Sequence, residues 1–133
     1  MSFLATLTVE GETFELISVS IELNQAVDAV GRPTSSTLGG KISFDIHSTP
    51  TDLWASWMMA PRATKDGSLT LWTKSEGTSM QTISFTNAYC IDMTERFDDT
   101  YSSFNLMLSI IISAQELKIG EVRLVNDWPQ AAT

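Results

Sequence analysis

The residues best suited to chemistry in this chain are its single histidine, His47, and its single cysteine, Cys90. Together they formally make a thiol and imidazole pair, and nucleophilic catalysis would also need a group that orients the base. Cys90 stands between Tyr89 and Ile91 within a predicted strand, where a free cysteine is usually a small buried side chain. His47 stands at a predicted strand end and is interpreted as a solvent-facing or capping residue. The sequence therefore predicts no catalytic set and no enzyme.

Metal and cofactor sites also lack their usual motifs. No HExxH, CxxC, phosphate-loop or GxGxxG pattern occurs in the sequence. Glu95, Asp98 and Asp99 offer oxygen ligands for a hard cation such as calcium, but not at the spacing of an EF-hand loop. We interpret this acidic group as a solvated turn. The sequence thus predicts neither a cofactor nor a metal site.

Composition and charge restrict the class of protein. The chain has 133 residues, 43% of them hydrophobic and 18% charged, which predicts one folded domain over residues 1–133. Sixteen acidic and eight basic side chains give a formal net charge of -8, and the basic residues are scattered. Binding to nucleic acid or to an anionic membrane needs a basic face. We therefore expect neither partner.

Compartment and export are predicted from the cysteine count and from the apolar segments. A single cysteine allows no internal disulfide and suits a reducing compartment. The opening MSFLATLTVE has no basic region and no apolar run typical of a signal peptide. The most apolar segment, 104–114, is far shorter than the roughly 20 residues that span a bilayer. We expect a cytoplasmic protein without membrane insertion, which would leave the cell only by a route without a cleaved signal.

Alternating apolar residues predict about seven β-strands and no repeated βαβ unit. A change of face near Leu16 or Ile17 predicts a bulge that bends the second strand. This order of elements indicates an antiparallel sandwich or a closed barrel with one helix beside it. The predicted strands cover residues 3–9, 14–23, 42–46, 69–72, 83–93, 104–113 and 117–124, the last of them broken at Gly120.

Three connecting details complete the predicted strands. Lys65, Asp66 and Gly67 predict a turn before the fourth strand. The fifth strand is expected to place the following residues on one face, together with Asn87: Ile83, Phe85, Tyr89, Ile91 and Met93. The polar segment TERFDDTYSS, 94–103, then predicts a connection rather than a strand.

One helix is predicted in the segment STPTDLWASWMMAP, 48–61. Ser48 or Thr49 is expected to cap its start, with Pro50 in the first turn, Asp52 near the positive end of the dipole, and Pro61 as the stop. Leu53, Trp54, Trp57 and Met58 form one apolar stripe. We interpret this stripe as an anchor to a sheet. The alternative is a monomeric β-barrel binding module that holds a small apolar ligand beneath the stripe.

A long polar excursion, 28–40, separates the second and third strands. Two to five residues would suffice to join them, and longer loops are usually functional or disordered. Pro33 stiffens the segment, while Gly31, Gly39 and Gly40 permit positive φ or close backbone approach. We therefore treat this loop as a candidate contact element.

Several strands carry apolar residues on both faces, which is more than a strand with one solvated face needs. Met107 and Ile111 lie opposite the main stripe of their strand, as do Leu4 and Trp72 on theirs. The second face is predicted to lie under the helix or against another subunit. Trp72 and Trp128, the latter in a polar tail, are candidate subunit-interface residues.

An ordered set of short motifs resembles a known family. The runs are LNQAVDAVGRP, GGKISF, SWM, KDG, AYCID with ERFD, ISAQELKIG and NDWP. In this order and spacing, covering nearly the whole chain from MSFLA to NDWP, they resemble the type VI secretion tube protein Hcp (TssD) in the form found in Bacteroidetes.

The resemblance implies a compact antiparallel β-barrel with a flanking helix, assembled as rings of six subunits that stack into a hollow tube. A VgrG spike would cap the tube, a contractile sheath would surround it, and effectors would travel with it into a neighbouring cell. Export by this route needs no signal peptide. The implied ring-stacking loop comprises Val30, Gly31, Arg32, Pro33, Thr34, Ser35 and Ser36. The tail-tube protein of a contractile phage-like particle, which shares this architecture, is the second alternative.

Overall fold

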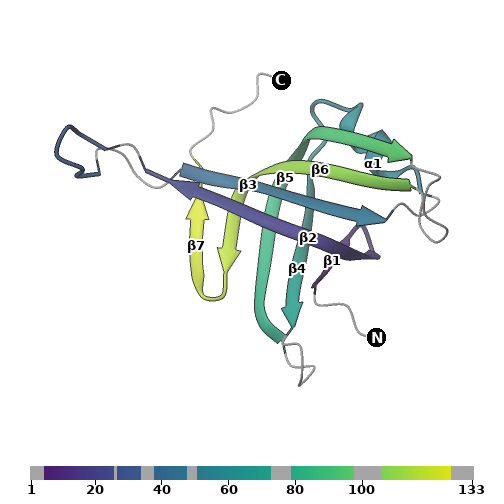
Figure 1. Cartoon of the computed structure of the whole chain (residues 1–133), viewed down its shortest axis with the longest axis horizontal. Helices are drawn as coiled ribbons and strands as arrows, with labels where there is room; N and C mark the ends of the chain where they lie inside the picture. Colours follow the sequence, from purple (N-terminus) through teal and green to yellow (C-terminus); the bar gives the residue numbers. More distant parts are fainter. Residues whose placement is uncertain are drawn as a thin grey trace.

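The computed structural model describes residues 5–25, 27–33, 38–47, 51–72, 79–97 and 106–126. Within these ranges the chain forms seven strands and one short helix (Figure 1). In chain order these elements are β1 (Ala5–Val9), β2 (Glu12–Asn24), β3 (Leu38–His47), α1 (Leu53–Met58), β4 (Lys65–Trp72), β5 (Ser79–Phe97), β6 (Leu106–Ile119) and β7 (Val122–Val125).

The strands form one antiparallel sheet that closes on itself. Their order is β3-β2-β1-β4-β5-β6-β7, and β3 also pairs with β6, so β1 to β6 make a barrel with β7 added to β6. Closure explains the bent strands, because β5 and β6 each run from one side of the barrel to another (Figure 1). The predicted mainly-β barrel is confirmed, and the open sandwich is not formed.

The barrel interior is filled by the alternating residues that predicted the strands. Ala5, Leu7 and Val9 of β1 are buried, and the same alternation holds in β3 and β6. The register between β2 and β3 shifts between Leu16 and Ser18, which confirms the predicted bulge. Further core residues from these strands are Ile42, Phe44, Ile46, Leu108, Ile110 and Ile112.

Helix α1 anchors itself in the core through its tryptophans. The Trp54 ring centroid lies 5.1 Å from that of Phe14 and 5.5 Å from that of Phe44, and the Trp57 ring stacks on Trp54 at 5.8 Å. Both indoles are 1% exposed. The predicted apolar stripe is therefore confirmed as an anchor, and side chains occupy the space beneath it.

The predicted start of the helix was wrong. Asp52 occupies the N-cap position without a side-chain capping bond, and the hydroxyl of Thr51 accepts a hydrogen bond from the Leu53 backbone N–H at 3.2 Å. This hydroxyl supplies a partner for the first N–H of α1, so the helix begins only after Thr51. Ser48, Thr49 and Pro50 lie outside the described residues.

Gly67 lies within β4 rather than in the predicted turn. It pairs with Val9 of β1 and with Phe85 of β5. A Cβ atom at this position would lie 2.5 Å from Phe85 Cζ and 2.6 Å from the Thr8 carbonyl oxygen. The glycine thus provides room for the Phe85 ring against the backbone of β1. The glycine that predicted a turn is therefore required for packing instead.

Strand β5 is longer than predicted and changes face at Asn87. Asn87 has φ +53°, and the register with β4 shifts near this position, so Ile83 and Phe85 are buried before it and Ala88 and Cys90 after it. The expectation that residues from Ile83 to Met93 share one face was wrong. The predicted polar connection was also wrong at its start, because the segment Glu95, Arg96 and Phe97 pairs with β6.

The last predicted strand is divided between two elements. Leu117 and Ile119 end β6, and Gly120, with φ +60°, forms a two-residue turn with Glu121 before β7. Gly120 therefore makes a hairpin rather than a break within one strand.

Candidate subunit interfaces

The loop between β2 and β3 projects beyond the barrel. Residues 27–33 lie well away from the barrel, past the ends of these strands (Figure 1). Val27 and Pro33 form an isolated antiparallel bridge across the base of this tip. Gly39 and Gly40, which were predicted within the loop, belong instead to β3. We call residues 27–33 the loop tip.

One carboxylate organises the loop tip. Asp28 Oδ1 accepts hydrogen bonds from the backbone N–H groups of Val30, at 3.0 Å, and Arg32, at 2.9 Å. Asp28 Oδ2 accepts from Arg32 Nε at 2.9 Å. These donors, first of all the Arg32 N–H, lower the pKa of Asp28 below its ordinary value of 3.8. Gly31 supplies the positive φ of +88° that the turn requires.

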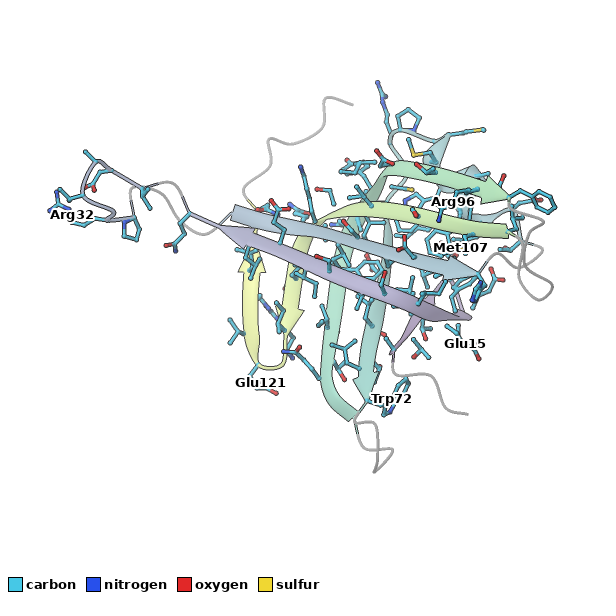
Figure 2. The ribbon with its side chains drawn as sticks, viewed as in Figure 1. Glu15, Arg32, Trp72, Arg96, Met107 and Glu121 are labelled. Atoms are coloured by element: carbon cyan, nitrogen blue, oxygen red, sulfur yellow. The ribbon has the colours of Figure 1, made fainter. Side chains whose placement is uncertain are left out.

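The loop tip presents side chains to solvent. Val27 is 60% exposed and Val30 74%, and the Arg32 side chain, labelled in Figure 2, is 78% exposed. Val30, Gly31, Arg32 and Pro33 of the predicted stacking loop thus lie together on a rigid turn. Thr34, Ser35 and Ser36 lie outside the described residues. The stacking role of all seven remains a prediction.

One outward surface of the barrel carries many polar side chains, together with Ile91, Met107 and Ile111. It is the outward side of residues 18–24 of β2, 41–47 of β3, 106–113 of β6 and 89–97 of β5, which lie side by side in that order. We call these segments the long-strand layer. Opposite Cα partners across it include the rows Ser18–Asp45–Ser109, Ser20–Ser43–Ile111 and Glu22–Lys41–Ser113.

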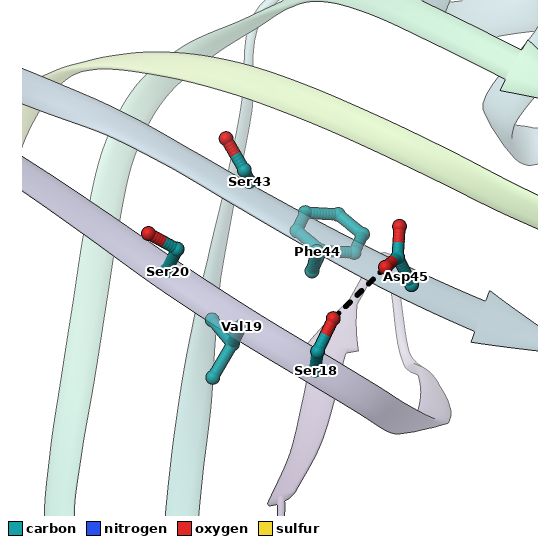
Figure 3. A pocket seen from close by; sticks show the side chains of 6 residues that line it. All are labelled: Ser18, Val19, Ser20, Ser43, Phe44 and Asp45. Carbon is teal, nitrogen blue, oxygen red and sulfur yellow. Dashed lines mark hydrogen bonds between the residues drawn. The ribbon is translucent and has the colours of Figure 1, made fainter.

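Asp45 holds three strands of this layer together. Asp45 Oδ2 accepts a hydrogen bond from Ser18 Oγ at 2.9 Å and Oδ1 accepts from Ser109 Oγ at 2.6 Å. Beside it is a hollow of about 250 Å³ lined by Ser18, Val19, Ser20, Ser43, Phe44 and Asp45 (Figure 3). This hollow is smaller than most small-molecule pockets and opens on a strand surface, so it does not indicate a ligand site.

Two edges of the long-strand layer lack a neighbouring strand in the described part of the chain. Residues 18–24 of β2 have ladder partners only in β3, because β1 pairs only with the start of β2. Residues 91–97 of β5 have ladder partners only in β6, because β4 pairs with β5 only up to Ala88. Unpaired edges offer rows of N–H and C=O groups to another chain.

Only one of the two predicted interface tryptophans lies within the described residues. Trp72 is partly exposed at the end of β4, at the lower end of the barrel in Figure 2 and well away from the loop tip. Trp128 lies outside the described residues. Their interface role therefore remains a prediction.

Cys90 is a structural residue, as predicted. Its side chain is buried and its Sγ lies 3.8 Å from Met58 Sδ. Burial raises the pKa of the thiol to about 11, so little reactive thiolate forms near neutral pH. His47 is half-buried at the end of β3.

Only Glu95 of the predicted acidic group lies within the described residues. Glu95 is exposed in β5, while Asp98 and Asp99 lie outside the described residues. No group of His, Cys, Asp and Glu side chains able to hold a metal ion occurs in the described ranges. Within the same ranges, no helix is long and apolar enough to cross a membrane.

Solved structures of Hcp proteins, and of a chain from an extracellular contractile injection system, have the same barrel fold. The Hcp1 structure from Flavobacterium johnsoniae is 33% identical, with a TM-score of 0.85 over 93% of this chain and 100% of that chain. Hcp1 from Salmonella typhimurium has the same fold at 11% identity and a TM-score of 0.72, over 90% and 86% of the two chains. A component of an extracellular contractile injection system sheath–tube complex has the fold at 19% identity and a TM-score of 0.57, over 92% and 91%.

The sequence itself identifies the family. The model of the family described as Hemolysin coregulated protein Hcp (TssD) matches residues 1–129. The chain belongs to the Hcp (TssD) family, whose members are structural tube proteins of type VI secretion systems. No curated protein sequence matches the chain.

Proposed function

We propose that this chain is a single-domain subunit of a type VI secretion tube in which six copies close into a ring and the rings stack end to end. The observation that carries the proposal is the pair of unpaired edges on opposite sides of the long-strand layer. Family membership supports the same assembly.

The two edges are suited to each other. Strand directions alternate across β2, β3, β6 and β5, so β5 of one copy beside β2 of the next continues the antiparallel order. The contact uses a different edge on each partner, and such a head-to-tail contact makes a ring when its rotation closes. Each interface would then satisfy backbone groups that a monomer leaves to solvent.

The shape of the subunit supports an inward-facing polar layer. Strands β1 and β4 and helix α1 lie on the side of the long-strand layer opposite its polar surface, so the subunit is thicker on that side. A sheet of such subunits curves with the thick side outward. The hydroxyl-rich surface then lines the hollow of the tube, where effectors would be carried.

The charges of that surface are mixed rather than strongly acidic. Glu22, Asp45 and Asp92 alternate with Lys41 and Arg96 on the outward positions of the layer. These three acidic and two basic side chains sum to a net charge of -1, whereas the whole chain carries -8. Such a lining offers no single strong field that would hold a charged cargo in place.

The loop tip supports ring stacking. It extends past the ends of β2 and β3, and is therefore placed to reach an adjacent ring if those strands run along the tube. Because hydrogen bonds to Asp28 already hold the backbone of this turn, less of its backbone freedom needs to be lost on binding. The VgrG spike, the contractile sheath and signal-independent export from the cytoplasm complete the proposal.

The assembly is tested by light scattering of the purified full chain and by negative-stain microscopy. We expect rings of about six subunits with a central hole. A strictly monomeric species at high protein concentration would contradict the proposal.

The edge pairing is tested by amide hydrogen exchange in the intact ring. Outward-pointing amides in residues 18–24 and 91–97 should exchange slowly, because a neighbouring subunit pairs with them. Strand β7, which is paired only with β6 in the described structure, is the internal control and should exchange faster. Equal, fast exchange at all three edges would exclude the proposed pairing.

The two alternatives predict different behaviour. A monomeric binding module would need a cavity beneath the helix, but Trp54 and Trp57 are packed against core side chains there. The tail tube of a phage-like particle shares the fold, as the injection-system structure shows for its own chain. Secretion that stops when the type VI membrane complex is removed would separate the tube of a secretion system from a free particle.

A further inference from the structure

The base of the projecting loop is bound by Asn126, the residue that follows β7. Asn126 Nδ2 donates hydrogen bonds to the carbonyl oxygens of Gly39 and Ala114, both at 2.9 Å. The backbone N–H of Asn126 donates to the Gln115 carbonyl oxygen at 2.7 Å. One side-chain amide thus connects the first residues of β3 to β6.

This bridge lies where the pairing between β3 and β6 ends. The ladder between β3 and β6 ends at the pair Lys41 and Ser113. Gly39 and Ala114 lie just past this pair, and there Asn126 replaces the missing ladder bonds. Because β3 begins at Leu38, the bridge fixes the strand within two residues of the loop.

Gly40 is fitted to the same bridge. It has φ +96°, and a Cβ there would lie 2.6 Å from the Ala114 carbonyl oxygen and 2.7 Å from Asn126 Nδ2. Leu124 packs beside Gly39, where an added Cβ would lie 3.3 Å from Leu124 Cδ2. The paired glycines therefore allow β7 and Asn126 to approach the loop base closely.

We propose that Asn126 is a positioning residue for the loop, which sets the direction in which the loop leaves the barrel and thereby ring stacking. This inference rests on the stacking role proposed above. The loop tip holds its own shape through Asp28, so its internal structure needs no support from the barrel. Its direction depends on the first residues of β3, and Asn126 holds these against β6.

The first test measures the direction of the loop within one subunit and does not depend on tube formation. Spin labels on Ala29→Cys and Glu121→Cys report the distance from the exposed loop tip to the β6–β7 turn, in labelled subunits diluted with unlabelled ones. Cys90 is buried and its pKa is about 11, so it should not take the label. Asn126→Ala should broaden the distance distribution, because both donors are lost.

Arg123→Ala is the matched control on the same hairpin. Its guanidinium Nε lies 2.8 Å from Glu116 Oε1 in a surface ion pair, away from the loop base. It should leave the distance distribution unchanged. A distribution in Asn126→Ala as narrow as that of the parent would overturn the proposal.

The second test measures stacking. Asn126→Ala should form rings but about tenfold fewer tubes, since two ordinary hydrogen bonds affect the population of the placed loop by roughly that factor. Asn126→Asp should form even fewer tubes than Asn126→Ala, because its carboxylate oxygens would face two carbonyl oxygens. Loss of the rings themselves, or tubes at the parent level, would each contradict a positioning role. If the parent chain forms no tubes, the stacking proposal fails, while the distance measurement still tests the bridge.

Discussion

Two regions of the molecule differ in what determines their shape. One is the barrel interior beneath helix α1, and the other is the loop tip. Around Trp54 and Trp57, many apolar side chains are buried together, and no single contact determines the arrangement. At the loop tip, exposed side chains surround a turn that depends on one carboxylate, Asp28. Changes in the first region should therefore alter folding, and changes in the second should alter assembly while the barrel stays folded.

The largest expected effect is on stability, from Trp54→Ala. Removal of a fully buried indole leaves a large cavity and should lower the free energy of unfolding by about 3–5 kcal/mol. Met59→Ala, next to the helix and 81% exposed, should change it by less than about 0.5 kcal/mol. Urea unfolding of both variants measures the difference, and equal losses would show that the helix does not anchor the core.

Replacement of residues 30–36 by a short glycine–serine link should distinguish most clearly between the role of the barrel interior in folding and the role of the loop tip in stacking. The barrel core is untouched, so rings and their thermal unfolding should remain as in the parent chain. Stacking into tubes should be abolished, because the exposed side chains of the tip are gone. Sedimentation and electron microscopy measure rings and tubes together, and rings that still polymerise would exclude the stacking role.

Asp28 tests whether the loop tip depends on one side chain. Asp28→Ala should reduce tube formation without affecting the barrel, and Asp28→Asn should do so less, since its side-chain oxygen can still accept from Val30 and Arg32. Similar tube yields for parent and Asp28→Ala would show that the turn is held by other contacts.

The Asp28 carboxylate should also make the stability of the loop-tip turn depend on pH. The pKa of Asp28 is lower in the folded turn than its ordinary value of 3.8. The carboxylate therefore stabilises the turn fully at any pH above that ordinary value. The contribution is lost as pH falls through the lower folded value. Amide chemical shifts of Val30 and Arg32 should therefore titrate with a midpoint below 3.8. A midpoint at or above 3.8 would contradict the observed bonding.

The smallest expected effect is that of salt on ring formation. Each subunit carries a formal charge of -8, so copies repel one another at low ionic strength. Screening, with a Debye length of about 10 Å at 0.1 M salt, should raise the ring fraction modestly. Light scattering across a salt series measures this change. Rings that weaken with added salt would show that attractive ion pairs dominate instead.

Apolar alternation was sufficient to predict most of the barrel. It located β1, β3 and β6 because β1 and β3 bury alternate residues and β6 does so as far as Ala114, and it located the bulge after Leu16. It failed at Gly67, where a tight packing contact has the composition of a turn. It also failed for Glu95, Arg96 and Phe97, which are paired with β6 although they are exposed.

The candidate interfaces were only partly predictable. Excess length and the positions of Pro33 and Gly31 indicated the loop tip, but the organising role of Asp28 depends on a turn that forms only in three dimensions. The unpaired edges of β2 and β5 follow from strand pairing and have no composition of their own. Asn126 lies far from Gly39 in sequence, and a single amide in a polar tail carries no spacing that would reveal this contact.

The change of face at Asn87 makes β5 sensitive to insertion and deletion in a way that its individual side chains are not. Before this residue the strand completes the barrel with β4, and after it the strand joins the long-strand layer. Another residue that tolerates positive φ, such as glycine or aspartate, could replace Asn87 at small cost. Deletion of Asn87 would instead leave Ala88 and Cys90 facing inward, because alternation from Phe85 would become regular, but it would move every later residue one position out of register with β6. Variation in this family should therefore alter the identity of this residue more readily than the number of residues around it.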